Sequence, residues 1–204
     1  MRGRPATHVR LATVTRSAFL VRSALAVGAA AGAAAVGPWT ARALAQSNDA
    51  EIVNFALTLE YLEATYYDQA LERVDLGSEA RALTQELADN ESQHVQTLRA
   101  LSRQLGSTPV ERPRLDFGGA YASQEAFLKL ANTFEDAGVS AYNGAGPMIR
   151  DSEVLAAAGT IVQVEGRHAA LIRILRDRPP APLAFDPPST MDDVLAAVDP
   201  FLED

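Results

Sequence analysis

Apolar residues recur every three or four positions in four long stretches of this chain. The stretches run over about residues 48–72, from Ser78 to Gly106, from near Ser123 to Gly144, and from Asp151 to about Asp177. Spacing of this kind places the apolar side chains on one face of a helix. Ser78 is expected to cap the second helix, and Pro179 and Pro180 end the fourth. The pattern therefore predicts four amphipathic helices.

The connections between these helices differ in length. The second connection contains Pro109, Pro113 and the pair Gly118–Gly119, and it is too long for a tight turn. It must run along the helices, which predicts an all-α four-helix bundle with one long crossover between helices 2 and 3. We assign residues 46–178 to the bundle and residues 179–204 to a Pro-rich tail. A short helix over about residues 190–198 of this tail is expected to pack on the outside of the bundle.

The first 45 residues differ in composition from the rest. They contain no Asp or Glu, begin with several arginines, stay uncharged from Ser23 to Thr40 and end in Ala43-Leu44-Ala45. This arrangement is typical of an export signal cut near Gln46, so we predict a periplasmic or extracellular protein. The alternative is a permanent membrane anchor, for which the apolar run is short. The segment Thr15–Leu20 is similar to a twin-arginine signal, with Ser17 in place of the second arginine.

The charge of the chain excludes two classes of partner. Of 18 basic and 26 acidic residues, 6 basic and no acidic ones precede residue 46, which leaves 12 basic against 26 acidic residues and a net charge of −14. Such a surface repels nucleic-acid phosphates and anionic lipids. We therefore predict no nucleic-acid partner and no membrane contact beyond the signal. The chain also lacks cysteine, so any metal site must use oxygen and nitrogen ligands.

The two halves of the bundle repeat one pattern of glutamate and histidine. Each half carries a glutamate and, about thirty residues later, a Glu-x-x-His motif. A glutamate and a histidine three residues apart share a helix face and can bind one metal ion together. The candidate ligands are Glu60, Glu91, His94, Glu135, Glu165 and His168. Four carboxylates and two imidazoles form the ligand set of a dinuclear centre, whose two cations would offset the cost of burying the carboxylates. The alternatives are a vestigial site and a charge-paired core without metal.

Three further residues are candidates for a catalytic role. Tyr67 and Tyr142 each lie seven residues after the glutamate of their helix, where each could donate to a carboxylate or carry electrons. The alternative is a pair of core tyrosines whose hydroxyls have found some partner. Glu63 lies one turn from Glu60, and its counterpart in the other half is Gly138. Glu63 is therefore either a movable extra ligand or proton relay in the space left by Gly138, or a solvated carboxylate at the bundle edge.

Gly166 stands inside the motif Glu165-x-x-His168. Glycine within a helix costs about 0.5–1 kcal/mol relative to alanine, so this motif is a weaker frame for its ligands than its counterpart on the second helix. Either another backbone approaches closely at Gly166, or this half of the site is softer.

The order Glu, Glu-x-x-His, Glu, Glu-x-x-His resembles that of the ferritin-like superfamily, which includes ferritins and rubrerythrins. The segments Asn54–Ala64, Glu135–Val139 and Ala184–Pro188 are similar to the exported, desiccation-related ferritin-like proteins. The resemblance implies a ferritin-like bundle in which Glu60 and Glu135 are terminal ligands. It further implies that Glu91 and Glu165 bridge two metals. His94 and His168 would each cap one of these metals.

The types of ligand limit which metals we expect in the site, and the metals in turn limit the expected function. Carboxylate and imidazole suit two iron or manganese ions, although copper and zinc bind such ligands more tightly, so loading before export would protect the site. We expect metal ions and a small oxidant as partners and leave a homodimer open. The leading hypothesis is an exported di-metal oxidoreductase, peroxidase-like or ferroxidase-like, acting on peroxide, oxygen or ferrous iron. The alternative is a non-enzymatic envelope protein that protects against desiccation or oxidative stress, with a structural or vestigial metal site.

Overall fold

The computed structural model describes residues 49–203, so the predicted export signal lies outside the described residues. The long elements are α3 (Asp49–Arg73), α4 (Ser78–Gln104), α5 (Gln124–Ala145), α6 (Ser152–Leu175) and α7 (Met191–Val198). Two short strands are β1 (Arg114–Leu115) and β2 (Leu202–Glu203), and 3-10 turns lie at Gly118–Tyr121, Gly146–Met148 and Asp199–Phe201. This confirms the predicted all-α class. No helix within residues 49–203 is both long enough and apolar enough to cross a membrane.

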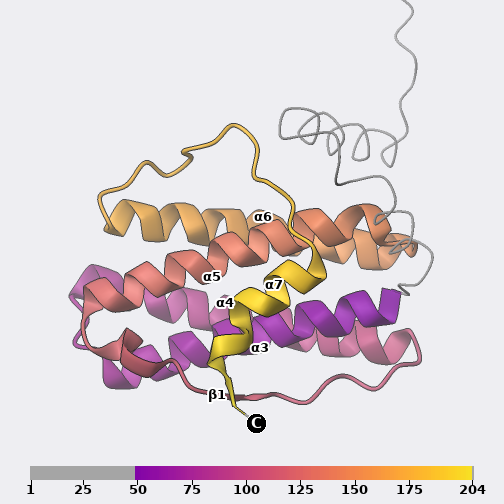
Figure 1. The fold of residues 1–204 in the computed structure, drawn as a ribbon, viewed down its shortest axis with the longest axis horizontal. Coiled ribbons are helices and arrows are strands. Elements are labelled where there is room, and N and C mark those ends of the chain that lie inside the picture. The colour runs from indigo at the N-terminus through magenta and orange to yellow at the C-terminus, as the bar shows by residue number, and fades with distance from the viewer. Residues whose placement is uncertain (1–48, 204) are drawn as a thin grey trace, which may run out of the picture.

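The four long helices α3 to α6 form a bundle (Figure 1). α3 packs mainly on α4 and α5 mainly on α6, and the two pairs meet through α3 with α5 and α4 with α6. The chain between α4 and α5 runs the length of the bundle before the third helix starts (Figure 1). The predicted bundle with one crossover is therefore confirmed. In this arrangement, each of the four helices turns one face toward a common interior.

The N-termini of α5 and α6 have side-chain caps next to them in the sequence, and that of α4 does not. α5 and α6 begin one residue after Ser123 and Asp151, whose side chains accept hydrogen bonds from backbone N–H groups of the first turn. The prediction that Ser78 caps α4 is wrong, because Ser78 is its first residue and Gly77 is the N-cap, with no capping side chain. The N–H of Gly77 instead donates to Gln124 Oε1 at 2.8 Å, a contact with a distant helix that local sequence does not reveal.

Asn54 on α3 anchors the start of the crossover. Its Oδ1 accepts from the hydroxyl of Ser102 at 3.0 Å and from the N–H of Val110 at 3.3 Å. Its Nδ2 donates to the carbonyl of Thr108 at 3.1 Å. One carboxamide thus joins α3 to the end of α4 and to the segment that follows it, which compensates for the lack of regular structure there.

An aromatic cluster around Tyr66 holds the rest of the crossover against the bundle. The ring of Tyr66 lies 4.9 Å from Phe117 and 5.3 Å from both Tyr121 and Phe127, measured between centroids. Its buried hydroxyl donates to the carbonyl of Phe127 at 2.9 Å. Aromatic pairs at these separations add to the stabilisation from buried area. The cluster therefore fixes α3 and α5 relative to each other, beside the residues that form the site.

The C-terminal tail lies on the outside of the bundle. It leaves α6, arches over the bundle and returns along α5 as α7 (Figure 1). Val194 and Val198 of α7 are buried in the core that α3 and α5 share. The tail comes so near α5 that a Cβ at Gly144 would lie 1.9 Å from the carbonyl oxygen of Ser189. After α7, β2 pairs antiparallel with β1 of the crossover. Strands of two residues are too short to be predicted from the hydrophobic pattern.

Candidate metal centre

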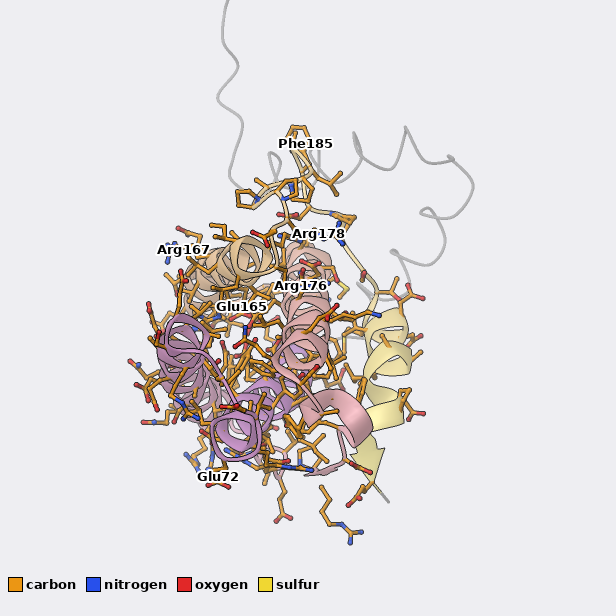
Figure 2. The ribbon with its side chains drawn as sticks, turned by 90° about the vertical axis from the view of Figure 1, so that its left-hand side faces the viewer. Glu72, Glu165, Arg167, Arg176, Arg178 and Phe185 are labelled. Carbon is orange, nitrogen blue, oxygen red and sulfur yellow. The ribbon has the colours of Figure 1, made fainter. Side chains whose placement is uncertain are left out.

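All six candidate ligands come together inside the bundle. Viewed end-on, the helices surround an interior in which Glu165 lies, whereas its neighbour Arg167 is on the outside and Phe185 of the tail points away (Figure 2). α3 contributes Glu60, α5 contributes Glu135, and α4 and α6 each contribute a Glu-x-x-His motif. The four glutamates are 0% exposed, and the two histidines are 9% or less exposed. The helical spacing seen in the sequence thus places every candidate ligand on an inward face.

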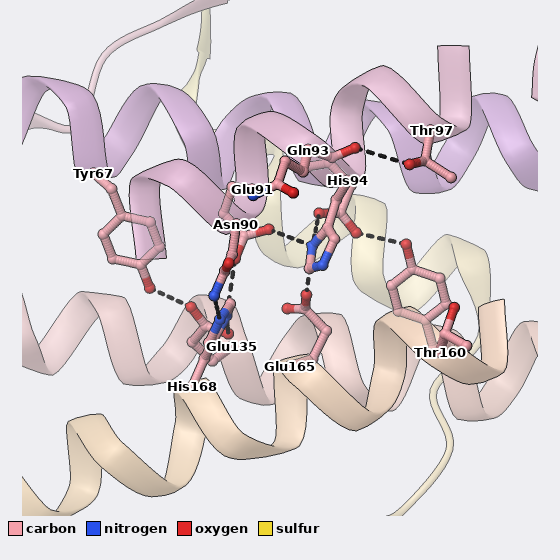
Figure 3. Close-up of polar contacts among 12 residues, drawn as sticks. Tyr67, Asn90, Glu91, Gln93, His94, Thr97, Glu135, Thr160, Glu165 and His168 are labelled. Carbon is pink, nitrogen blue, oxygen red and sulfur yellow. Dashed lines mark hydrogen bonds and ion pairs between the residues drawn. The ribbon is translucent and has the colours of Figure 1, made fainter. Parts of the chain in front are cut away.

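His94 lies at one end of the cluster, with three carboxylates around one ring nitrogen (Figure 3). Its Nδ1 is 2.9 Å from Glu91 Oε2, 3.1 Å from Glu60 Oε2 and 3.1 Å from Glu165 Oε1. These carboxylates come from three different helices. A single nitrogen and three oxygens therefore converge on a small volume.

His168 lies at the other end, where two carboxylates face one ring nitrogen. Its Nδ1 is 2.8 Å from Glu91 Oε1 and 3.4 Å from Glu135 Oε2. The two imidazole rings lie 6.2 Å apart between centroids, at an interplanar angle of 29° (Figure 3). Glu91 contacts both histidines with its two oxygens, so it lies between the two ends of the cluster.

Two overlapping groups of four residues could each hold a metal ion. The first is Glu60, Glu91, His94 and Glu165, and the second is Glu91, Glu135, Glu165 and His168. Within each group, one ligand atom per residue lies within 4.8 Å of the others. Glu91 and Glu165 belong to both groups, and the remaining glutamates and histidines belong to one each. Two adjacent metal positions that share two carboxylates are what this geometry can accommodate.

Tyr67 and Tyr142 each bind the glutamate of the opposite half. The hydroxyl of Tyr67, on α3, donates to Glu135 Oε1 on α5 (Figure 3). The hydroxyl of Tyr142, on α5, donates to Glu60 Oε1 on α3 at 2.5 Å. In both glutamates the second oxygen, Oε2, faces a histidine Nδ1. Each tyrosine therefore occupies one carboxylate oxygen and leaves the other turned toward the cluster.

Glu63 is buried, so its interpretation as a solvated carboxylate at the bundle edge is wrong. It is 2% exposed, and it faces Gly138 of α5. A Cβ at Gly138 would lie 3.3 Å from Glu63 Oε1 and 3.4 Å from Glu165 Oε2. The missing side chain of Gly138 thus makes room for Glu63 next to the cluster. A cavity of about 10 Å³ that these two residues line with Val198 of α7 borders the same spot.

Gly166 has open space around it. A Cβ added there would meet nothing within 4 Å, so no backbone approaches this glycine. Of the two explanations for Gly166, close approach of another chain segment is therefore wrong. The glycine weakens the helix that carries Glu165 and His168 without a packing reason in the described residues.

The protonation of the cluster reflects the burial of many carboxylates together. Burial, reinforced by neighbouring carboxylates, raises the pKa of Glu63 and Glu165 well above the ordinary value. Burial by itself would lower the pKa of His94, but hydrogen bonds to its carboxylates outweigh it and raise that pKa to about 12. The pKa of His168 is likewise raised to about 11, because Glu135 and Glu91 face its ring and outweigh the effect of burial. Without metal, the cluster therefore retains protons on groups that would release them in water.

The donor atoms fit divalent metal ions. Five buried atoms of the cluster make no hydrogen bond within residues 49–203: Glu91 Oε1, Glu135 Oε2, both carboxylate oxygens of Glu165, and His168 Nδ1. His168 Nδ1 and Glu91 Oε1 are close enough for an ion pair, yet they lack the directionality of a hydrogen bond. Buried polar atoms without partners are rare and costly. Oxygen and nitrogen atoms left unpaired in one small volume are the ligands that iron and manganese accept.

Asn90 contacts the cluster although sequence reasoning did not single it out. It directly precedes Glu91 on α4, and its Nδ2 lies 3.1 Å from His168 Nε2 on α6 (Figure 3). The sequence offers one indication of this role, which is a difference between the two repeats. Asn90 precedes Glu91, whereas Val164 occupies the matching position before Glu165.

Comparison with known proteins adds one match. The sequence pattern of a family described as the ferritin-like domain matches residues 48–178. This range covers α3 to α6 and therefore every residue of the cluster. No protein with a curated description matches the chain.

Proposed function

The chain belongs to the ferritin-like domain family, and we propose that it is an exported oxidoreductase whose bundle holds two iron or manganese ions. The substrates would be peroxide, dioxygen or ferrous iron. The observation that carries this proposal is the pair of overlapping ligand groups that share Glu91 and Glu165. Two metal ions bound side by side supply a centre that can exchange two electrons with an oxidant.

We assign the ligands by their positions in the cluster. Glu91 and Glu165 would bridge the two ions, because both belong to both groups. Glu60 with His94 would complete one position. Glu135 with His168 would complete the other. The total of four carboxylates matches the charge of two divalent cations, which removes the cost of leaving these groups buried and unpaired.

The tyrosines would position the terminal carboxylates. Because Tyr67 and Tyr142 each hold the Oε1 atom of a glutamate, Oε2 alone is free to bind metal. This arrangement would favour binding of metal through the second oxygen of each glutamate. Either hydroxyl also lies close enough to supply a proton or an electron during turnover.

Glu63 would be an additional carboxylate on one side of the centre. It faces Glu165 across the space at Gly138, so a change of its side-chain rotamer could bring it to a metal or move a proton to a bridging carboxylate. Tyr142 also lines a cavity of about 20 Å³, whose other lining side chains are apolar and come from all four helices. Such a cavity has room for one small apolar molecule, which supports dioxygen as one oxidant.

The first test is metal analysis of the mature protein purified from the envelope fraction of its own host, since folded export would preserve the metal loaded in the cytoplasm. We expect about two iron or manganese ions per chain. His94→Ala and His168→Ala should each lower this content. Gln93→Ala and Arg167→Ala are matched controls, because both residues are exposed neighbours of the histidines and should leave it unchanged.

Turnover then separates the two candidate functions. An oxidoreductase consumes peroxide or oxidises ferrous iron at a rate that both histidine substitutions abolish. A protective envelope protein with a structural site gains thermal stability from metal but shows no turnover, and that result would replace the enzymatic proposal. A folded wild-type protein without bound metal would contradict the enzymatic proposal and favour a protective protein whose metal site is vestigial. Sequencing the N-terminus of the same sample tests export, because cleavage should leave Gln46 or a close neighbour first.

A further inference from the structure

The two histidines of the cluster differ at the ring nitrogen that faces away from the carboxylates. His168 Nε2 lies 3.1 Å from Asn90 Nδ2. Within residues 49–203, the polar contacts of His94 are all made by Nδ1. One imidazole is therefore held at both nitrogens and the other at one.

The repeat explains why only one histidine has this partner. Asn90 precedes Glu91, and Val164 precedes Glu165, so the two residues occupy equivalent positions in the two motifs. Asn90 reaches across from α4 to the histidine of α6. Valine at the equivalent position of α6 has no atom that could bond to the histidine of α4.

Exposure follows the same order as the hydrogen bonds. The side chain of His94 is 11% exposed, whereas that of His168 is 3% exposed. Solvent therefore reaches the edge of the His94 position and hardly reaches the other. An ion bound beside His94 has the shorter route to water.

A carboxamide at Asn90 suits a histidine that binds metal. When Nδ1 binds a metal ion, Nε2 carries the proton and needs an acceptor. Rotation of the Asn90 amide by half a turn presents Oδ1 to Nε2 in place of Nδ2, because the two atoms are nearly interchangeable in shape. This bond fixes the ring from a neighbouring helix, and so it offsets the softness that Gly166 introduces into the helix of His168.

We propose that the two metal positions are unequal, and that Asn90 is the positioning residue that makes them so. The position completed by Glu135 and His168 retains its ion. The position completed by Glu60 and His94 exchanges its ion with the solution. The inference rests on the proposed dinuclear centre, and it adds an order of loading and a place where ions enter and leave.

The test measures Mn²⁺ binding to the full chain after removal of metal with a chelator. Equilibrium dialysis gives the affinities, and electron paramagnetic resonance separates isolated from coupled Mn²⁺ ions. We expect two binding steps in the wild-type protein, with the first about 10- to 100-fold tighter, which is the usual effect of such a hydrogen bond on metal affinity. Isolated Mn²⁺ should dominate the spectrum at one equivalent, and coupled pairs at two.

Four variants identify the cause. Asn90→Ala should weaken the tighter step about 10- to 100-fold and bring the two steps together. Asn90→Asp keeps an acceptor for Nε2–H and should restore the separation. Val164→Asn supplies the missing partner and should tighten the weaker step. Gln93→Ala, an exposed amide on α4 whose bond is to the carbonyl of Asp89, is the control and should change neither step.

The outcomes separate this inference from the proposed function. Two equal steps in the wild-type protein, or an unchanged first step in Asn90→Ala, would overturn the inference and leave the dinuclear centre intact. No binding of Mn²⁺, iron or any other divalent ion to the folded wild-type protein would overturn both. Circular dichroism checks that each variant is folded. If Asn90→Ala does not fold, Val164→Asn still tests the inference.

Discussion

The half of the bundle formed by α3 and α4 and the half formed by α5 and α6 share their candidate metal ligands and differ around them. Tyr67 and Tyr142 occupy equivalent positions, yet each donates to the glutamate of the other half. Each group of candidate ligands likewise draws on three helices. Neither half therefore contains a complete set of candidate ligands. The repeat teaches that the site depends on the packing of the pairs, not on either pair alone.

The differences between the halves lie just outside the ligands. Glu63 in the first half faces Gly138, its counterpart in the second. On the outer face, Gly144 of α5 accommodates the tail, whereas its counterpart on α3, Gln69, is hydrogen-bonded to Arg73. The two halves thus share the residues that contact each other across the bundle and differ where one half makes a separate contact.

The largest expected effect concerns the pair Glu63 and Gly138. In the metal-free protein, burial raises the pKa of Glu63 above its value in the unfolded chain. Stability is then fully present below about pH 4.5 and falls as pH rises toward the folded-state pKa, by at most about 1.4 kcal/mol per pH unit. Glutamine cannot ionise, so the free energy of unfolding of Glu63→Gln should increase relative to that of the wild-type protein as pH rises. Urea unfolding in the presence of a chelator, at about pH 5 and about pH 8, measures the difference. Parallel stability curves would show that Glu63 does not hold a proton.

The next effect concerns the tail, which covers α5 and not α3. Gly144→Ala places a Cβ against the backbone of Ser189, which also donates its N–H to the carbonyl of Ser140 at 2.9 Å. Because the conflict is with backbone, we expect a loss of about 3 kcal/mol in the free energy of unfolding. Gly159→Ala on α6 is the control, since its Cβ meets nothing within 4 Å. Equal stability of Gly144→Ala and wild type would mean that the tail is not seated on α5.

The two tyrosines allow a symmetric test. Tyr67→Phe and Tyr142→Phe each remove a hydroxyl from a buried carboxylate and leave one oxygen without its donor. We expect each change to cost about 1–3 kcal/mol in the metal-free protein, and the two costs to be similar. The double variant should depart from the simple sum, because Glu60 and Glu135 both interact with Glu91 and so belong to one network. Thermal unfolding measures all three, and a cost confined to one variant would break the symmetry of the halves.

The ligand cluster could be predicted because the spacing of its residues along single helices indicates a shared face. The residues around the cluster could not be predicted in this way. Glu91 and His94 share a helix face by spacing alone, and the repeat supplied the same statement for Glu165 and His168. The position of Glu63 depended on how closely α5 approaches α3, which follows from a missing side chain on the partner helix.

The same distinction holds for the contacts that sequence reasoning missed. Asn90 meets His168 across two helices far apart in the chain, and Gly77 meets Gln124 in the same way. Periodicity assigns a residue to a face, but it does not say which residue of another helix lies opposite. The packing of Tyr66 with the crossover is of this kind as well.

The smallest expected effect concerns Gly166, which weakens one motif and has no counterpart in the other, where Ser92 stands between Glu91 and His94. Its Cβ would meet nothing, and its backbone is helical, so Gly166→Ala should raise the free energy of unfolding by about 0.5–1 kcal/mol. If the helix of His168 relies on Asn90 for rigidity, the alanine should also reduce the loss of Mn²⁺ affinity that Asn90→Ala causes. Denaturant unfolding and equilibrium dialysis of both single variants and the double variant measure this coupling. Strictly additive effects on affinity would show that the glycine and the asparagine act separately, and that the softness of this helix does not reach the metal position.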